Sequence, residues 1–194
     1  MKKIKTETFR LIVILFLFVS AVQIVWSSDW PMYRADAARS GYTIDPLSAR
    51  LNLSWVWKTD SAPIPAWSGK DTRMPFDLAF QPVVSKDTVF FGNSFDCKLY
   101  ALDAKTGFEK WTFFTDSPIR FAPAVWKNRI FIVSDDGFLY CLAIKDGKLL
   151  WKKRGGPDKD MILGNDRLIS RWPARGGAGN KGRYCLFRCR NLDI

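Results

Sequence analysis

The most chemically suggestive residues in this chain are two adjacent carboxylates, Asp135 and Asp136. Two carboxylates on one loop would supply hard oxygen ligands for a cation such as Ca²⁺. They are followed by Gly137 and lie between two apolar runs, a setting in which Asp is favoured because its side chain hydrogen-bonds the backbone of a tight turn. We therefore favour a hairpin turn over a cation site at this pair.

Other reactive side chains are few. The chain contains no histidine, so it lacks the commonest general base and a common metal ligand. Its four cysteines form no Cys-x-x-Cys pair, and Cys185 and Cys189 have no histidine partner, which disfavours a zinc site. We expect no catalytic residue and no metal ligand in the chain as written, and cofactor-binding residues stay undefined.

Aromatic and cationic side chains occur in two long polar connections, one before Pro82 and one after Trp151. Long loops on one face of a rigid scaffold are where ligands and partners bind. The candidates for such a loop-face binding site are Trp67, Arg73, Arg167, Arg171 and Trp172. The competing interpretation, which we prefer, is that these side chains pack within their loops and carry solvated charge.

The net charge of +11 does not indicate nucleic-acid binding. More than half of the excess lies in residues 1–10 and 181–194, which we do not expect to belong to the folded part of the protein.

An internal repeat reveals the architecture that positions these loops. The stretch Leu99–Trp111, LYALDAKTGFEKW, returns in similar form at Leu139–Trp151, LYCLAIKDGKLLW. Upstream, Pro82 corresponds to Pro123. A period near forty residues is typical of repeat architectures.

Each copy is predicted to form four short antiparallel strands. Apolar residues alternate between turn signals such as Lys86-Asp87, and the last turn of each copy ends in Gly107 or Gly147, where we expect positive φ. A helix is disfavoured because helical spacing of apolar residues lasts no more than about two turns beyond the N-terminal apolar run. Four strands in about forty residues make one β-propeller blade. The predicted fold class is therefore all-β, an incomplete ring of about two blades with flanking strands.

A tryptophan closes each copy, at Trp111 and Trp151. A blade cannot bury both faces alone, and a large side chain on its outermost strand can fill the gap to the next blade. Such burial contributes on the order of 3 kcal/mol. We prefer this packing role to cofactor stacking, which would need a central position that the pattern does not support.

Residues 1–28 have the layout of a secretory signal peptide, with a basic start, an apolar run over 11–26 and small residues before Asp29. Cleavage after Ser27 is preferred to an uncleaved anchor helix, because Ser20 and Gln23 interrupt the short run. No cysteine follows the run directly, which speaks against a lipid-anchored start. We expect an exported protein, periplasmic, cell-surface or secreted, that meets a membrane only through the signal peptide.

The segment ALDAKTGFEKW resembles the docking motif A-x-D-x-x-T-G-x-x-x-W of the pyrroloquinoline-quinone-like (PQQ-like) β-propeller repeat family. The residues that carry this resemblance are Ala101, Asp103, Thr106, Gly107 and Trp111, with Gly147 and Trp151 in the second copy. The second copy departs from the motif at Cys141, Ala143 and Asp146. Segment 29–43 resembles the start of exported members, and LSWVWKT resembles the last strand of a blade closed elsewhere. The resemblance covers roughly residues 29–177 and implies a fold and a blade-docking role for these residues.

Dehydrogenase members of the family would imply a central quinone, a Ca²⁺ ion, a catalytic Asp and often a disulfide between adjacent cysteines. This chain has no adjacent cysteines, and no Asp or Glu stands in a matching context. We expect no cofactor for this fragment, and PQQ with calcium only if a full-length parent is a dehydrogenase.

The resemblance and the repeat together divide the chain into six parts. They are a signal peptide (1–28), a lead-in segment with the last strand of a split blade (29–77), two blade repeats (78–117 and 118–156), an inter-blade loop (157–176) and an aberrant tail (177–194). The tail is rich in Arg where a third repeat should begin, and a one-base shift of permitted codons restores that repeat. This indicates a frameshift, and a genuine basic tail is the alternative.

Two blades do not close a ring, because propellers typically have about 4–8 blades. We therefore expect a propeller fragment with a binding or scaffolding role, more readily a non-enzyme than an enzyme, whose partners are missing blades or another protein. The alternatives are the N-terminal part of a quinone-dependent dehydrogenase or of an outer-membrane assembly propeller. We expect the isolated chain to be marginally stable and prone to aggregate.

Overall fold

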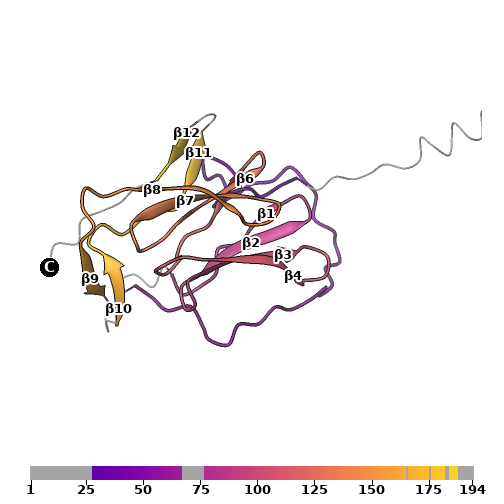
Figure 1. Ribbon diagram of the computed structural model, residues 1–194. Helices are drawn as coiled ribbons and strands as arrows, with labels where there is room; N and C mark the ends of the chain where they lie inside the picture. The colour runs from indigo at the N-terminus through magenta and orange to yellow at the C-terminus, as the bar shows by residue number, and fades with distance from the viewer. Residues whose placement is uncertain (1–27, 67–76, 165, 175, 182–183, 188–194) are drawn as a thin grey trace, which may run out of the picture.

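Two four-stranded antiparallel sheets lie side by side in the computed structural model, which describes residues 28–66, 77–164, 166–174, 176–181 and 184–187 (Figure 1). The first sheet, blade 1, contains β1 (Val83–Ser85), β2 (Thr88–Asn93), β3 (Lys98–Asp103) and β4 (Glu109–Phe114), paired in that order. The second sheet, blade 2, contains β5 (Ala124–Trp126), β6 (Arg129–Val133), β7 (Phe138–Ala143) and β8 (Leu149–Arg154). The predicted all-β class, with four strands for each repeat, is confirmed.

Tight turns set the register of each blade. In blade 1, Ser85 pairs with Thr88, and the turn between them contains Lys86 with a left-handed φ of 54°. The β3–β4 and β7–β8 turns contain Gly107 and Gly147, with φ of 74° and 70°. A side chain with a Cβ resists this conformation, which explains why the sequence has glycine at both positions.

Both blades have a register shift at the same place in the third strand. The shift falls between Ala101 and Leu102 in blade 1, and between Cys141 and Leu142 in blade 2. Such a bulge bends a strand and increases its twist. The repeat therefore extends beyond the pattern of apolar residues to the detailed backbone path.

The largest buried cluster fills the space between the blades. Phe90 and Leu99 of blade 1 and Ile130 of blade 2 belong to it, and each is 0% exposed. Ile119, from the connection between the blades, packs so tightly on Gly92 that an added Cβ would lie 2.1 Å from its Cγ2. Each such burial contributes about 1.5–3 kcal/mol, so the two blades stabilise each other through a shared core.

The lead-in segment runs as an irregular strap outside the two sheets (Figure 1). At its start, Trp30 and Val84 exchange two backbone hydrogen bonds, each 2.8 Å long. The carbonyl of Pro31 then accepts a hydrogen bond of 2.7 Å from the backbone N–H of Val125. Consecutive residues thus join the first strand of blade 1 to the first strand of blade 2.

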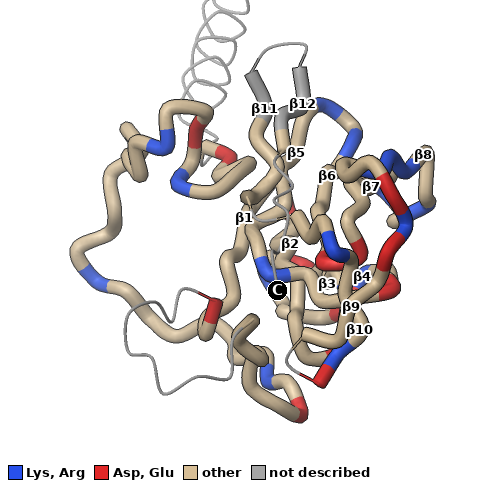
Figure 2. Tube along the Cα trace, turned by 90° about the vertical axis from the view of Figure 1, so that its left-hand side faces the viewer, with Lys and Arg blue, Asp and Glu red and all other residues tan. Residues whose placement is uncertain are grey.

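Two hairpins flank the blades, and both views place them at opposite ends of the molecule (Figures 1 and 2). They are β9 (Met161–Gly164) with β10 (Arg167–Ser170), and β11 (Gly179–Lys181) with β12 (Tyr184–Leu186). The first lies in the segment 157–176, for which we expected a loop, and the turn signal that predicts it is Gly164 followed by Asn and Asp. The second lies in the tail 177–194, whose frameshift origin stays a prediction.

The predicted signal peptide falls almost entirely outside the described residues, so export also stays a prediction. Among the residues that are described, no helix has the length and apolar character needed to span a membrane.

Candidate functional sites: the loop face and the blade contacts

A buried arginine organises one end of the blades, which we call the loop face. This face consists of the β2–β3 turn (94–97), the β6–β7 turn (134–137), the connection 115–121 and the β9–β10 hairpin. Arg120 lies beneath it with a side chain only 2% exposed. Its Nε is 2.6 Å from Oδ2 of Asp135 and its Nη1 is 2.9 Å from Oδ2 of Asp77. The Arg120 side chain thereby connects the lead-in segment to blade 2.

The same cluster explains what the adjacent carboxylates do. Asp135 faces Arg120, whereas Oδ1 of Asp136 accepts the backbone N–H of Phe138 at 2.9 Å and Oδ2 accepts the hydroxyl of Tyr140. The two side chains therefore serve different partners, as the turn interpretation expects. Burial raises the pKa of Asp136 above its ordinary value.

Among the described residues of this face, none fits the quinone and Ca²⁺ that the resemblance would imply for a dehydrogenase member. A metal would need carboxylates whose oxygens are turned toward one point, but Asp77 and Asp135 both bind Arg120, and Asp136 binds donors of its own turn. No group of three His, Cys, Asp or Glu side chains in the described ranges could hold a metal ion. We derive no chemical step through these groups.

The candidate binding residues of the loop face do not converge. Arg167 lies against the β2–β3 turn, with its Nη1 3.5 Å from Sγ of Cys97 and its guanidinium 5.9 Å from the centre of the Phe95 ring. Arg171 and Trp172 instead contact segment 158–160.

In that segment, Arg171 Nη1 is 3.2 Å from Asp160 Oδ2, and Trp172 Nε1 donates to Asp158 Oδ2 at 3.0 Å. Trp67 and Arg73 lie outside the described residues. A binding role for these five residues stays a prediction, and the contacts of the three described ones are those of loop packing.

The blade contacts are built from a tryptophan and a glycine turn. The Trp111 indole lies on the β7–β8 turn, where its Nε1 donates to the carbonyl of Ile144 at 3.2 Å. An added Cβ at Gly147 would lie 2.5 Å from Cε3 of Trp111, so only glycine allows this approach. The last strand of blade 1 therefore docks on the last turn of blade 2.

Trp55 of the lead-in segment repeats this contact on blade 1. Its Nε1 donates to the carbonyl of Ala104 at 3.0 Å, and an added Cβ at Gly107 would lie 2.7 Å from its ring. Residues around Trp55 thus lie against blade 1 as the fourth strand of blade 1 lies against blade 2. The structure assigns them no strand. Sequence reasoning predicted the last strand of a split blade in this segment and did not single out Trp55.

The remaining motif residues hold the turn in place. Oδ1 of Asp103 accepts the backbone N–H groups of Lys105 and Thr106, both at 3.0 Å, and the Thr106 hydroxyl at 3.1 Å. A hydrogen bond from Lys110 is the main reason why the pKa of Asp103 falls to about 2. Ala101 pairs with Trp111 across the two strands, is 0% exposed and belongs to the core cluster between the blades.

Trp151 occupies in blade 2 the position that Trp111 occupies in blade 1. Its side chain packs beside Phe131, with ring centres 6.0 Å apart, yet it is 39% exposed. The neighbouring Leu149 and Leu150 are 40% and 46% exposed. Within the described part of the chain, no glycine turn covers Trp151 in the way that Gly147 covers Trp111. We call this surface of β8 the open face.

The fold and these repeated contacts define a protein of the β-propeller repeat class. A family model described as PQQ_2, outer membrane protein assembly factor BamB, matches residues 24–171. The chain belongs to this family of PQQ-like propeller repeat proteins. A comparison with curated proteins found no match.

Two solved dehydrogenase structures agree with this fold. The quinohemoprotein alcohol dehydrogenase from Comamonas testosteroni is 21% identical with a TM-score of 0.53, and the match covers 78% of this chain and 23% of that one. A europium-containing methanol dehydrogenase is 19% identical with a TM-score of 0.57, covering 84% of this chain and 27% of that one. BamB from Moraxella catarrhalis is 16% identical with a TM-score of 0.35, over 53% of this chain and 44% of that one.

The chain thus spans about a quarter of the length of the two dehydrogenases that it matches. The two blades correspond to part of a propeller in these proteins, and the likeness establishes the fold.

Proposed function

We propose that this chain is part of an exported β-propeller with a binding or scaffolding role, and that its open face receives a further blade, supplied by the same protein or by a partner. The observation that supports the proposal is the series of three tryptophans. Trp55 and Trp111 each cover a glycine turn, whereas Trp151 presents the same side chain from the same strand position with a large exposed fraction.

The chemistry of the open face suits a blade better than a soluble ligand. The exposed side chains Leu149 and Trp151 are apolar, and each would gain about 1–2 kcal/mol from full burial. At the equivalent contact, the partner of Trp111 is a backbone turn with a carbonyl acceptor. A second blade of the same kind supplies both features.

A binding role is preferred to catalysis for two reasons. The described carboxylates of the loop face have protein partners, as shown above for Asp135 and Asp136. The matching family model is described as an outer membrane protein assembly factor, which is a role in assembly.

The test is to supply the missing contact. Residues 118–156 would be repeated directly after Gly156, so that the added copy of Gly147 comes to lie beside Trp151. We expect the 5-fluorotryptophan NMR signal of Trp151, assigned with Trp151→Phe, to lose its solvent sensitivity. We also expect the urea midpoint of unfolding to rise. The matched control carries Gly147→Ala in the added copy only, which should leave Trp151 exposed.

Two results would count against the proposal. If Trp151 stays solvent-sensitive beside a folded third blade, the open face is not a blade-docking surface. If PQQ and Ca²⁺ added to the full chain give a saturable absorbance change, the dehydrogenase alternative replaces the scaffold.

A further inference from the structure

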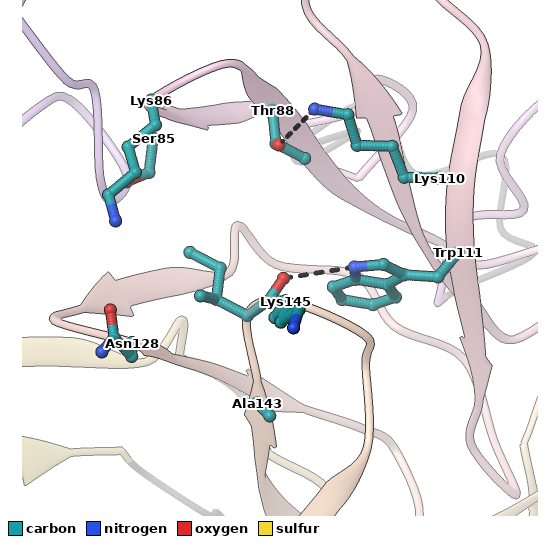
Figure 3. A pocket seen from close by; sticks show the side chains of 9 residues that line it. Ser85, Lys86, Thr88, Lys110, Trp111, Asn128, Ala143 and Lys145 are labelled. Carbon is teal, nitrogen blue, oxygen red and sulfur yellow. Dashed lines mark hydrogen bonds between the residues drawn. The ribbon is translucent and has the colours of Figure 1, made fainter.

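A pocket of about 590 Å³ opens between the two blades at the end opposite the loop face (Figure 3). It is bounded by the β1–β2 turn and β4 of blade 1 and by the β5–β6 and β7–β8 turns of blade 2. Its lining residues include Lys86, Lys110, Trp111, Asn128 and Lys145, with Ala143 and Ile144 at the end of β7. The contact between the blades contributes Trp111 and Ile144 to its wall, but the docking proposed at Trp151 does not involve the pocket.

The pocket has an excess of positive charge. Three lysines line it, and none of its nine lining residues is acidic. Lys110 is already engaged, because its Nζ lies 3.0 Å from Oγ1 of Thr88 and 3.2 Å from Oδ2 of Asp103. Among the described residues, Lys86 and Lys145 form no ion pair. Two cationic side chains thus remain for a ligand.

A departure from the repeat takes a carboxylate away from the pocket wall. In blade 1 the turn carboxylate is Asp103, whereas blade 2 has Ala143 at the corresponding position on the pocket wall. Both turns have the same backbone hydrogen bond. Gly107 N–H donates to the backbone carbonyl of Asp103 at 2.8 Å, and Gly147 N–H donates to the backbone carbonyl of Ala143 at 2.9 Å. The turn of blade 2 keeps a carboxylate at Asp146, which accepts the backbone N–H of Lys148 at 3.1 Å, but Asp146 does not line the pocket. The substitution therefore moves a negative charge off the pocket wall.

Part of the wall is apolar, at Trp111, Ala143 and Ile144. The Trp111 indole donates its N–H to the carbonyl of Ile144 at 3.2 Å, so the ring presents carbon atoms to the pocket. Figure 3 shows Lys86 and Asn128 on one side of the pocket and Trp111 on the other, with Lys145 between them. Lys110 lies on the Trp111 side as well, so the pocket combines cationic side chains with an apolar surface. This combination suits a ligand with an acidic part and an apolar part.

We propose that this pocket binds a small organic anion, with its acid group near Lys86, Lys145 and Asn128 and its apolar part against Ile144 and Trp111. The inference goes beyond the proposed function, and it does not depend on whether a blade docks at Trp151.

The test uses a matched pair of ligands on the full chain. 3-Phenylpropionate carries the charge, and 3-phenylpropanamide has nearly the same shape without it. Titration is followed by the NMR signal of the Trp111 indole N–H, assigned with Trp111→Phe. We expect saturable shifts for the acid, weaker binding of the amide by about tenfold, and weaker binding of the acid in 0.5 M NaCl because salt screens exposed charges.

Three variants locate the site. Lys145→Gln should weaken acid binding roughly threefold, and Ala143→Asp should weaken it about tenfold by restoring the carboxylate of the repeat. Lys148→Gln is the control, because Lys148 follows Gly147 in the same turn and does not line the pocket. It should leave binding unchanged.

Equal binding of the acid and the amide would overturn the proposal, and so would full binding in Ala143→Asp. Circular dichroism of each variant separates loss of binding from loss of fold. If Lys148→Gln weakens binding as much as Lys145→Gln does, the anion is attracted by the general positive charge and the pocket is not its site.

Discussion

Replacing Gly147 with alanine should disrupt the contact that joins the two blades. The added Cβ would lie 2.5 Å from Cε3 and 2.9 Å from Cδ2 of Trp111, so the indole must move. The φ of 70° adds a cost of about 1 kcal/mol for any residue with a Cβ. Moving the indole loses its hydrogen bond to Ile144, worth about 1 kcal/mol, and part of its burial, worth about 1–2 kcal/mol.

The expected loss is thus about 3–4 kcal/mol in the free energy of unfolding, measured by urea denaturation with fluorescence and circular dichroism. This is a large part of the 5–15 kcal/mol typical of a whole domain (about 0.1 kcal/mol per residue). In a Trp111→Leu background the same substitution should cost only the conformational part, about 1 kcal/mol, because the collision is gone.

Gly177→Ala is the matched control, since its nearest neighbours would be 3.5 Å from the new Cβ and its φ is not in the left-handed region. It should change the free energy of unfolding by no more than about 0.5 kcal/mol. The reasoning is refuted if Gly147→Ala unfolds at the same urea concentration as the unmodified chain, or if both alanine variants lose equal stability.

Three further perturbations test other contacts. Arg120→Ala should cost about 3–5 kcal/mol in urea denaturation, because two buried carboxylates lose their partner; Arg120→Lys, which keeps the charge, should cost less, and equal losses would contradict this account. Asp136→Asn should stabilise the protein at pH 7. Burial raises the folded-state pKa of this carboxyl, so the stability that it contributes is present below its unfolded pKa and is lost as the pH rises through the folded pKa. The gain in melting temperature should therefore vanish toward pH 3, and a pH-independent gain would exclude titration as its cause. Trp151→Ala should cost less than half as much as Trp111→Ala, for which about 3–5 kcal/mol is expected, because Trp151 is 39% exposed; equal costs would mean that the open face is covered.

The strands of both blades could be predicted because their signals are local. Alternating apolar residues and the glycines at 107 and 147 fix the strand positions and the turns, and the structure has them where the repeat predicts. The packing position of Trp111 also follows from the repeat. This position depends on how each blade is displaced from the next, and the period near forty residues gives that displacement along the chain.

The Arg120 cluster could not be predicted, because its members come from distant segments. Asp77, Arg120 and Asp135 have no common spacing, and each alone resembles an ordinary loop charge. The β9–β10 hairpin was missed for a different reason. Its strands have only four residues each, and Leu163 and Leu168 are largely exposed, so burial does not reinforce the pattern.

The strap at residues 29–31 has a consequence for the assembly of the two blades. It precedes both blades in the chain, yet its partners Val84 and Val125 lie more than fifty and more than ninety residues later. Contacts of such long sequence separation carry a larger loop-closure entropy than the hairpin contacts within each blade. Because consecutive residues bond to both first strands, the strap can close only on two blades that already have the correct offset. A pair of blades docked in the wrong register would leave one of these backbone groups without its partner, so the strap favours the correct offset between the blades.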